Sequence, residues 1–600
     1  MFRTLEIRPI PLTSPWFRRR AEEFLSGAGL SLDPGLDYLA GIYDADERLI
    51  GCGGLEGHTI KCLALSEETR GENLGATLVS HLYGIARERG AICVTLFTKP
   101  ENLATFRSLG FHYIGQAPLA VMMQSSSKPL EDYKAYLRTL PRGSRNGVIV
   151  MNANPMTEGH LHLIRKGAEE CDCLTVIPVA DNPATQYPYA TRREIMMRAC
   201  ADMNNVTIAE GSEYAVSAST FPSYFLKRKS DASPTHIALD LDIFARHIAP
   251  SLDATVRFVG SEPTDPLTAA YNKEMHNLLP ASGIEVIEIE RITKDDFPIS
   301  ASRLRKLTEE GALEAALELA VPAARPWILA RQAACALRKE LDLTPKPGLV
   351  DRHDSGSHKD MDHPLMARSI EALEPWFARF AEIAAALPFP EEREERTDKL
   401  RTAAIEAEKS MLEATGGINT HRGAIFAAGL MTAATAILIS SGRPLTERRL
   451  REEISAMARL IPRAEGSHGA RVAEGYYIPT ALDIARGGYE ALFSLWLPFY
   501  RRLKDDNEEE ASLKTLLLII STLQDSNAFY RGGGMIADLC MEEAKNLLKD
   551  FSLEGVSEMN RRFVERNVSH GGSADMLALT FLADSILRQE IESERTDAVH

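Results

Sequence analysis

The chain has 600 residues, of which 44% are hydrophobic and 25% are charged. This composition is typical of a soluble globular protein, and the length exceeds what one hydrophobic core supports, so three or four domains are expected. A formal net charge of −16 argues against a nucleic-acid partner, because DNA and RNA are held by basic surfaces. The eight cysteines contain no CxxC pair, which argues against a zinc site and a disulfide framework.

The N-terminus is charged and lacks the apolar core of a signal peptide. The longest apolar stretch, residues 425–440, is shorter than the roughly 20 residues of a membrane span, and it contains Thr432 and Thr435. We therefore expect a buried core helix here, no membrane partner, and a cytoplasmic protein.

Residues 1–125 predict a first α/β domain, with strands at 49–55, 60–65 and 92–97. A turn at residues 70–76 opens an apolar-periodic helix, and the amides of such a turn can hold a pyrophosphate. The order of elements resembles the GNAT-type acetyltransferase fold, whose coenzyme A loop reads R/Q-x-x-G-x-G/A. That resemblance implies acyl or pantetheine contacts at Arg70, Gly75 and Ala76, although Asn73 stands where the first glycine belongs. Whether the domain binds coenzyme A, a carrier arm or nothing stays open, as does a plain α/β domain.

Small polar residues and a second breaker cluster predict a linker at residues 126–146. Strands and helices then alternate through residues 147–322, which indicates a doubly wound parallel sheet with ligands at the carboxyl ends of its strands. The expected strands are 147–151, 174–179, 206–209, 236–239, 256–259 and 284–289.

The stretch 152–160 reads as a tight loop between a strand and a helix. Such a loop points backbone N–H groups and a helix N-terminus at one place, which favours an anion. Thr157, Gly159 and His160 add a hydroxyl, a residue without a side chain and an imidazole there. The loop therefore predicts a phosphate site.

A second helix start follows at residues 298–303, where Ser300, Ser302 and Arg303 supply hydroxyls and a guanidinium. Two such sites in one sheet domain suggest a single polyphosphate. Arg192 and Lys166 have no specific spacing, and we expect both to be solvated surface residues.

T-x-G-H followed by I-S-x-S-x-x-R is the signature of the nucleotidylyltransferase superfamily, and the segments around it resemble citrate lyase ligase. These further segments are Gly211 to Tyr214, Ala218 to Phe225 and Phe258 to Pro263. The resemblance implies that acetate attacks ATP, pyrophosphate leaves, and acetyl-adenylate acetylates the prosthetic-group thiol on the acyl carrier subunit of citrate lyase. It implies that His160 and Thr157 contact the triphosphate with Mg²⁺, and that Ser300, Ser302 and Arg303 hold pyrophosphate. Asn154 and Gly159 would complete the ATP site.

Strand signals nearly vanish after Pro326, and long helical patterns predict an all-α domain over residues 327–600. Glycine-containing polar loops at 345–362, 415–423 and 567–575 interrupt the helices. Each alone reads as a helix cap, but three could converge at one end of a bundle and bind phosphates.

In order, these loops resemble the triphosphoribosyl-dephospho-coenzyme A synthase family, with His570 standing where proline is expected. The implied reaction joins the ribose C1 of ATP to dephospho-coenzyme A and expels adenine. Asp360 and Asp575 are the candidate catalytic carboxylates, and Asp360 with Asp362 the candidate Mg²⁺ ligands. Candidate substrate contacts are His358, Lys359, Asn419, His421, Arg422, Gly571, Gly572 and Ser573.

We therefore expect a bifunctional enzyme: one half builds the prosthetic-group precursor of citrate lyase and the other acetylates the finished thiol. The rival for the first half is an adenylyltransferase of coenzyme A or NAD synthesis. The rival for the second is a synthase serving malonate decarboxylase. A non-catalytic scaffold that binds a carrier protein is the third alternative.

Overall fold

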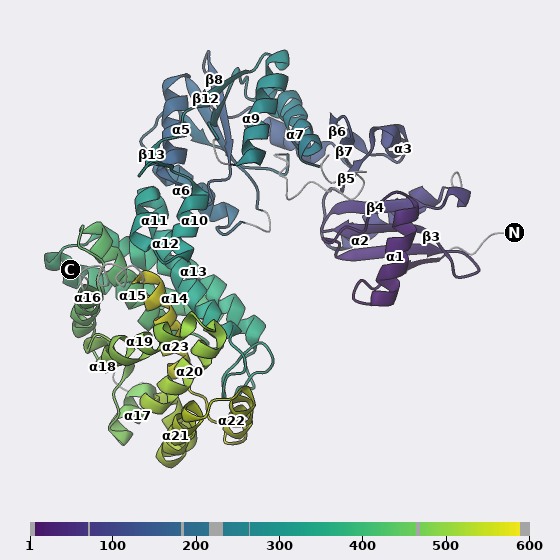
Figure 1. Ribbon diagram of the computed structural model, residues 1–600. Coiled ribbons are helices and arrows are strands. Elements are labelled where there is room, and N and C mark those ends of the chain that lie inside the picture. The colour runs from purple at the N-terminus through teal and green to yellow at the C-terminus, as the bar shows by residue number, and fades with distance from the viewer. Residues whose placement is uncertain are drawn as a thin grey trace. The chain divides into compact units, whose positions relative to one another are not determined.

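A mixed seven-stranded sheet occupies the N-terminal part of the chain (Figure 1). The computed structural model describes residues 6–69, 73–181, 185–214, 232–262, 265–463 and 468–587. The strand order is β1-β2-β3-β4-β5-β7-β6, and helices α1 (Pro15–Gly27), α2 (Leu74–Glu88) and α3 (Leu103–Ser108) accompany the sheet. The strands are β1 (Glu6–Pro9), β2 (Tyr38–Tyr43), β3 (Leu49–Glu56), β4 (Thr59–Leu65), β5 (Thr95–Thr98), β6 (His112–Ala117) and β7 (Ala120–Gln124).

Strands β4 and β5 are the only described parallel neighbours of this sheet, and they pair over a short length. Their register joins Thr59 to Thr95 and Ile60 to Leu96, so the rest of β4 continues without β5 beside it. Cys62 has a φ of 55°, a left-handed conformation that bends β4 at this point. The two strands therefore separate towards the end from which α2 follows.

A second sheet has five parallel strands in the order β10-β9-β8-β11-β12. They are β8 (Asn146–Met151), β9 (Cys173–Pro178), β10 (Val206–Ile208), β11 (Val256–Gly260) and β12 (Glu285–Ile289). Helix α5 (Glu158–Glu169) packs on one face, while α7 (Ala232–Ile243) and α9 (Pro266–Leu278) lie on the other (Figure 1). The strand order reverses at β8, which makes the carboxyl end of β8 the crevice where doubly wound sheets bind ligands.

The predicted strand at 236–239 is wrong, because these residues lie within α7. His236, Ile237 and Leu239 are all buried. A helix that is apolar on most of its surface gives no clear 3.6-residue period, so a short window of it reads as a strand.

The predicted linker contains helix α4 (Lys128–Leu137), and Gln124 just before it ends β7 with no exposed surface. The Gln124 amide donates to Glu213 Oε1 (3.1 Å) and accepts from the Tyr214 hydroxyl (3.0 Å). His58 Nε2 lies 3.1 Å from Glu213 Oε2. Side chains of the first sheet and of the turn between β3 and β4 therefore hydrogen-bond residues 213–214, which follow strand β10 of the second sheet. The two sheets are thus linked by side-chain contacts as well as by the connecting segment.

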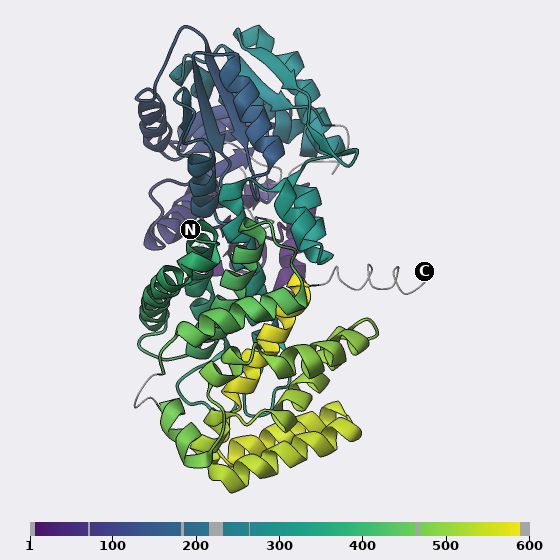
Figure 2. The same cartoon turned by 90° about the vertical axis from the view of Figure 1, so that its left-hand side faces the viewer.

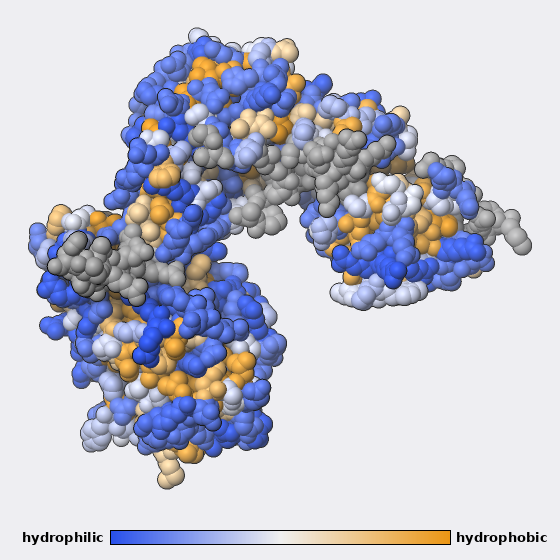
Figure 3. Space-filling model, viewed as in Figure 1, coloured by the Kyte–Doolittle hydropathy of each residue, from blue (hydrophilic) through white to orange (hydrophobic). Residues whose placement is uncertain are grey.

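The chain divides into two compact units, Met1–Ile299 and Ser300–His600. The second is helical, and α23 (Gly571–Ile586) runs through its middle (Figure 2). It packs against α12 (Arg325–Asp342), α15 (Arg422–Ser440) and α20 (Glu508–Thr522). In Figure 3, hydrophilic residues cover most of the drawn face of this unit, with hydrophobic ones gathered near α20 and α23. Its main helices are α10 (Ala301–Glu309), α11 (Leu313–Leu319), α12 (Arg325–Asp342), α13 (His363–Ala386), α14 (Arg393–Ala414), α15 (Arg422–Ser440), α16 (Glu447–Leu460), α17 (His468–Tyr476), α18 (Ala481–Arg486), α19 (Leu497–Lys504), α20 (Glu508–Thr522), α21 (Ser526–Lys549), α22 (Leu553–Glu565) and α23.

Helix α15 is the one described helix that is long and apolar enough to cross a membrane, and 78% of its apolar window is buried. Its contacts with α13, α16 and α23 account for that apolar surface.

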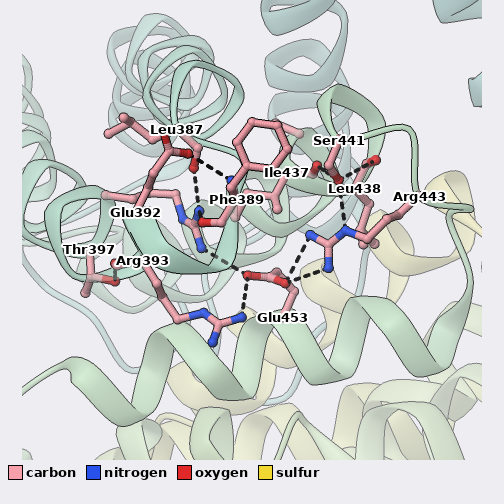
Figure 4. Close-up of polar contacts among 12 residues, drawn as sticks. Leu387, Phe389, Glu392, Arg393, Thr397, Ile437, Leu438, Ser441, Arg443 and Glu453 are labelled. Atoms are coloured by element: carbon pink, nitrogen blue, oxygen red, sulfur yellow. Dashed lines mark hydrogen bonds and ion pairs between the residues drawn. The ribbon is translucent and has the colours of Figure 1, made fainter.

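The buried carboxylate of Glu453 links several helices of this unit (Figure 4). Glu453 on α16 accepts from the guanidiniums of Arg396 on α14 (3.1 Å) and of Arg443 after α15 (3.2 Å). Arg396 also donates to the carbonyl oxygens of Leu387 and Phe389, which closes the end of α13. Removing one member would leave buried charge uncompensated, so this cluster fixes how these helices pack.

Candidate active sites

The loop between β8 and α5 has the geometry of an anion site. Thr157 is fully buried and takes the N-cap position of α5 with extended backbone. Ala153 has a φ of 44°, a left-handed conformation that L-residues adopt only under constraint. The loop lies at the carboxyl end of β8, where the strand order reverses.

His160 closes this loop through one ring nitrogen. The backbone N–H of Thr157 donates to His160 Nδ1 (3.0 Å), and the Thr157 hydroxyl lies 2.9 Å from the same atom. Because Nδ1 accepts a backbone N–H, the imidazole is the neutral tautomer with its proton on Nε2. The loop therefore sets Nε2–H as a hydrogen-bond donor at the helix start.

Gly159 is required by a close approach of two backbone segments. A Cβ at this position would lie 2.6 Å from the carbonyl oxygen of Ile299. Any side chain here would force that strand-end segment away from α5.

Arg192 lies beneath the loop with no exposed surface. Its guanidinium donates to the carbonyl oxygens of Asn152 (2.8 Å), Val179 (2.8 Å) and Tyr187 (2.9 Å). It also bonds the carboxylate of Asp181 at 2.8 Å. It therefore ties the segments that follow β8 and β9 to α6 (Tyr189–Ala199).

The expectation of a surface position is correct for Lys166, which is half-exposed and pairs with Glu169, and wrong for Arg192. A buried arginine bonded to carbonyl oxygens leaves no charge pattern in the sequence that could announce it.

Of the other predicted ATP-site residues, Ser300, Ser302 and Arg303 lie at the start of α10, and Asn154 lies in the loop between β8 and α5. Ser300 is the N-cap of α10, and its hydroxyl accepts from the backbone N–H of Arg303 (3.1 Å). Ser302 is exposed and accepts from the Arg305 guanidinium (3.2 Å). Counted from Ile299, the arginine position of the I-S-x-S-x-x-R pattern falls on Arg305, two residues after Arg303. Asn154 is buried, and its side-chain oxygen accepts from Tyr187 N (3.0 Å).

The predicted pyrophosphate turn of the first domain is described only in part. Asn73 caps α2 in the left-handed conformation, with a φ of 59°, and Gly75 and Ala76 are half-buried in its first turn. Arg70 lies outside the described residues.

In the helical unit, the predicted loops converge. A Cβ on Gly348 would lie 2.4 Å from the carbonyl oxygen of Val568, and Gly356 packs equally closely on residues 348–349. The Ser357 hydroxyl donates to Val568 O (2.6 Å), and His358 Nε2 lies 2.8 Å from the Ser569 hydroxyl. These contacts join the 345–362 loop to the loop that precedes α23.

Asp575 joins the 415–423 loop to this group. A Cβ on Gly423 would lie 1.9 Å from Asp575 Oδ2, so the carboxylate lies directly on the first turn of α15. Asp575 is half-buried. Burial and the neighbouring carboxylates of Glu340 and Asp525 raise the pKa of Asp575 well above its ordinary value.

His421 is the buried imidazole of the same region. Its Nδ1 lies 2.8 Å from the Ser369 hydroxyl, and its Nε2 has no hydrogen-bond partner among the described residues. Burial, with Lys346 and Arg338 nearby, lowers the pKa of His421 to about 3, so the ring is neutral. Ser573 bonds Asp525 through its backbone N–H and hydroxyl.

The remaining predicted synthase residues lie nearer the surface. Asp362 caps α13 (2.9 Å to Leu365 N), and Arg422 pairs with Glu408. Lys359, Asp360 and Asn419 are exposed, while Gly571 and Gly572 are half-buried in the first turn of α23. The described residues contain no group of three His, Cys, Asp or Glu that could hold a metal ion.

Comparisons with known proteins match three parts of the chain. Residues 146–325 match the citrate lyase ligase C-terminal domain, residues 326–593 match ATP:dephospho-CoA triphosphoribosyl transferase, and residues 3–111 match the acetyltransferase (GNAT) family. The chain is 40% identical to the [citrate [pro-3S]-lyase] ligase of Escherichia coli over 308 residues, 50% of this chain and 87% of the relative. It is 36% identical to the 2-(5''-triphosphoribosyl)-3'-dephosphocoenzyme-A synthase of Pectobacterium atrosepticum over 265 residues, 42% of this chain and 87% of the relative.

The chain belongs to both families. It joins a citrate lyase ligase of two α/β domains to a helical triphosphoribosyl-dephosphocoenzyme-A synthase, which confirms the predicted fold class and the fusion.

The loop contacts of the synthase half depend on residues that the sequence did not single out. Glu340 forms a buried ion pair with Lys346, Asn560 accepts from Gly348 N (2.8 Å), and Arg531 donates to Ser357 O (2.8 Å). Burial and Arg531 lower the pKa of His358. Glu340, Arg531 and Asn560 lie within helices α12, α21 and α22, where polar residues normally face solvent, so no local signal marks them.

In the ligase half, replacing Arg192 by methionine is expected to destabilise the first unit by about 3–5 kcal/mol, because three buried carbonyl oxygens lose their donor. The neighbouring Arg193→Met removes a partly exposed pair with Glu210 and is expected to cost at most about 1 kcal/mol. Urea unfolding of both variants measures the difference. Equal stability of the two would contradict the bracing role of Arg192.

Proposed function

We propose that the first half of the chain activates acetate with ATP and acetylates the prosthetic-group thiol of citrate lyase. The observation that carries this proposal is the donor geometry at His160, whose Nδ1 accepts the Thr157 N–H (3.0 Å), so that the ring carries its proton on Nε2. A fixed donor at a helix start stabilises the charge that develops when a carboxylate attacks a phosphate. The family relationship supports ATP as the substrate.

In this proposal, an acetate oxygen forms a bond to the α-phosphorus while the bond to the pyrophosphate oxygen breaks. His160 and Thr157 contact the triphosphate around the reacting phosphorus, and Asn154 and Gly159 admit the nucleotide. Ser300, Ser302 and Arg303 hold the leaving pyrophosphate. The thiol then takes the acetyl group, and AMP leaves. The thiol belongs to the acyl carrier subunit, and Arg70, Gly75 and Ala76 contact its pantetheine arm.

The second half, in the same proposal, makes the triphosphoribosyl precursor of that prosthetic group from ATP and dephospho-coenzyme A. The 2′-hydroxyl oxygen of dephospho-coenzyme A bonds to the ribose C1, the bond from C1 to adenine breaks, and the hydroxyl proton ends on adenine. Asp575 accepts that proton as the new C–O bond forms and then passes it to the leaving adenine. Its contact with Gly423, among the converging loops, supports its presence at this site. His358, Lys359, Asn419, His421, Arg422, Gly571, Gly572 and Ser573 surround the substrates.

Mg²⁺ would neutralise triphosphate charge at both sites. It is commonly held by one or two carboxylates and phosphate oxygens, so two carboxylates suffice. Asp360 is exposed and fits that role, with Asp362 two residues away. All eight cysteines are free, which agrees with a cytoplasmic protein.

Two assays of the purified chain test the proposal. With Mg²⁺, ATP and dephospho-coenzyme A should release adenine, and ATP with acetate and the thiol form of the carrier subunit should release pyrophosphate. Absence of both products would refute it, and pyrophosphate exchange into ATP that does not require acetate would refute the ligase half.

A further inference from the structure

Tyr489 combines three unusual features in a segment that packs towards Asp575, because the turn that follows it, Leu492–Trp496, contacts α23, the helix of Asp575. Only 1% of its surface is exposed, yet its hydroxyl has no hydrogen-bond partner among the described residues. Its φ is 53°, although a bulky side chain disfavours the left-handed conformation. Burial, and after it the charge of Asp575, raises the pKa of Tyr489, so the hydroxyl keeps its proton.

The backbone around Tyr489 is built to hold this conformation. Gly488 is also left-handed, with a φ of 66°, and the Tyr489 N–H donates back to the Ile484 carbonyl oxygen (3.1 Å). The Tyr489 carbonyl oxygen then accepts from Leu492 and Phe493, where a widened helical turn (Leu492–Trp496) begins. Left-handed residues and widened turns concentrate at functional sites.

Packing alone does not explain the hydroxyl. A phenylalanine would fill the same volume, and burying a hydroxyl without a partner costs free energy. A buried donor without a partner among the described residues, in a segment that packs against the helix of Asp575, points to a partner in a ligand. A ribose hydroxyl fits such a pair, because it donates to a carboxylate and accepts from a phenol.

We propose that Tyr489 is a substrate-contacting residue of the synthase site, whose hydroxyl donates to the ribose hydroxyl that lies against Asp575. The assignment deepens the proposed synthase activity and rests on it. The hydroxyl comes from the ribose of ATP or from that of dephospho-coenzyme A.

The test compares two tyrosines that are equally buried. Tyr500 is also 1% exposed, but its hydroxyl accepts from Lys339 (2.6 Å) and donates to Glu508 (2.9 Å). Tyr489→Phe is expected to keep or raise the unfolding temperature of the full chain and to lower kcat/KM for adenine release about tenfold. Tyr500→Phe is expected to lower the unfolding temperature and to leave kcat/KM for adenine release unchanged. Unchanged kcat/KM in Tyr489→Phe would overturn the assignment, as would a matching loss of stability in both variants.

The source of the hydroxyl follows from substrate analogues. If the partner is a hydroxyl of ATP, 2′-deoxy-ATP or 3′-deoxy-ATP should remove the difference between wild type and Tyr489→Phe. If it belongs to dephospho-coenzyme A, the tenfold difference should persist with both analogues.

A wild-type chain that releases no adenine would contradict the proposed function instead. Thermal protection by ATP and by dephospho-coenzyme A then decides about Tyr489. Weaker protection of Tyr489→Phe than of wild type by either ligand supports the contact, and equal protection by both overturns it.

Discussion

Replacing His160 by alanine is expected to abolish acetate-dependent pyrophosphate release while adenine release continues at the wild-type rate. The imidazole donates to the reacting phosphate in the proposed mechanism, and removing one such donor costs about 10²–10³-fold in rate. The alanine also removes the acceptor of the Thr157 N–H, which would cost about 1 kcal/mol of stability at the helix start. Rates of both products from one preparation measure the effect.

His160→Gln separates the two consequences of that change. Glutamine at the third helical position can accept the N–H of the N-cap residue, as in a capping box. The glutamine variant should therefore keep the wild-type unfolding temperature and still lose ligase activity. Ligase activity that recovers in His160→Gln would mean that His160 only shapes the loop. Loss of adenine release in either variant would mean that the two halves are coupled.

The α/β architecture and the main helices follow from sequence pattern because the relevant signals are local. The parallel strands from 147 to 289 are short aliphatic runs between helices, and each such run is visible in a window of a few residues. The prediction of a strand at 236–239 was wrong because it also used a short window, and a buried helix and a buried strand look alike over four residues.

Candidate site residues were predictable where they sit in motifs at helix starts. Thr157 and Ser300 cap helices, and a cap has a sequence signature. Arg192, Glu340 and Tyr489 act through contacts that are remote in the sequence, so only packing reveals them. Tyr489 looks like an ordinary core aromatic until its hydroxyl is seen to lack a partner among the described residues.

The Asp575→Asn variant is expected to lose adenine release by about 10²–10⁴-fold, the usual effect of removing a general base, with ligase activity unchanged. The same substitution should raise the free energy of unfolding, although it lowers the activity. Burial, Glu340 and Asp525 raise the pKa of Asp575, so the native state holds this proton to a higher pH than the unfolded chain does. Stability is therefore lost as pH rises above the unfolded-state pKa of about 3.9. The asparagine variant should be more stable than wild type at pH 8, and the difference should vanish towards pH 4.

Asp584 on the same helix is the matched control. Its carboxylate is buried but bonds Arg501 (2.7 Å) and Lys504 (2.5 Å); burial acts to raise its pKa, yet these two cations hold it below the ordinary value. That group contributes stability above the unfolded-state pKa and loses it as pH falls through the native value. Asp584→Asn should thus destabilise the helical unit by about 3–5 kcal/mol at pH 8 and leave adenine release per folded molecule unchanged. Opposite stability changes from the same substitution on one helix would show that α23 carries one carboxylate for packing and one for chemistry.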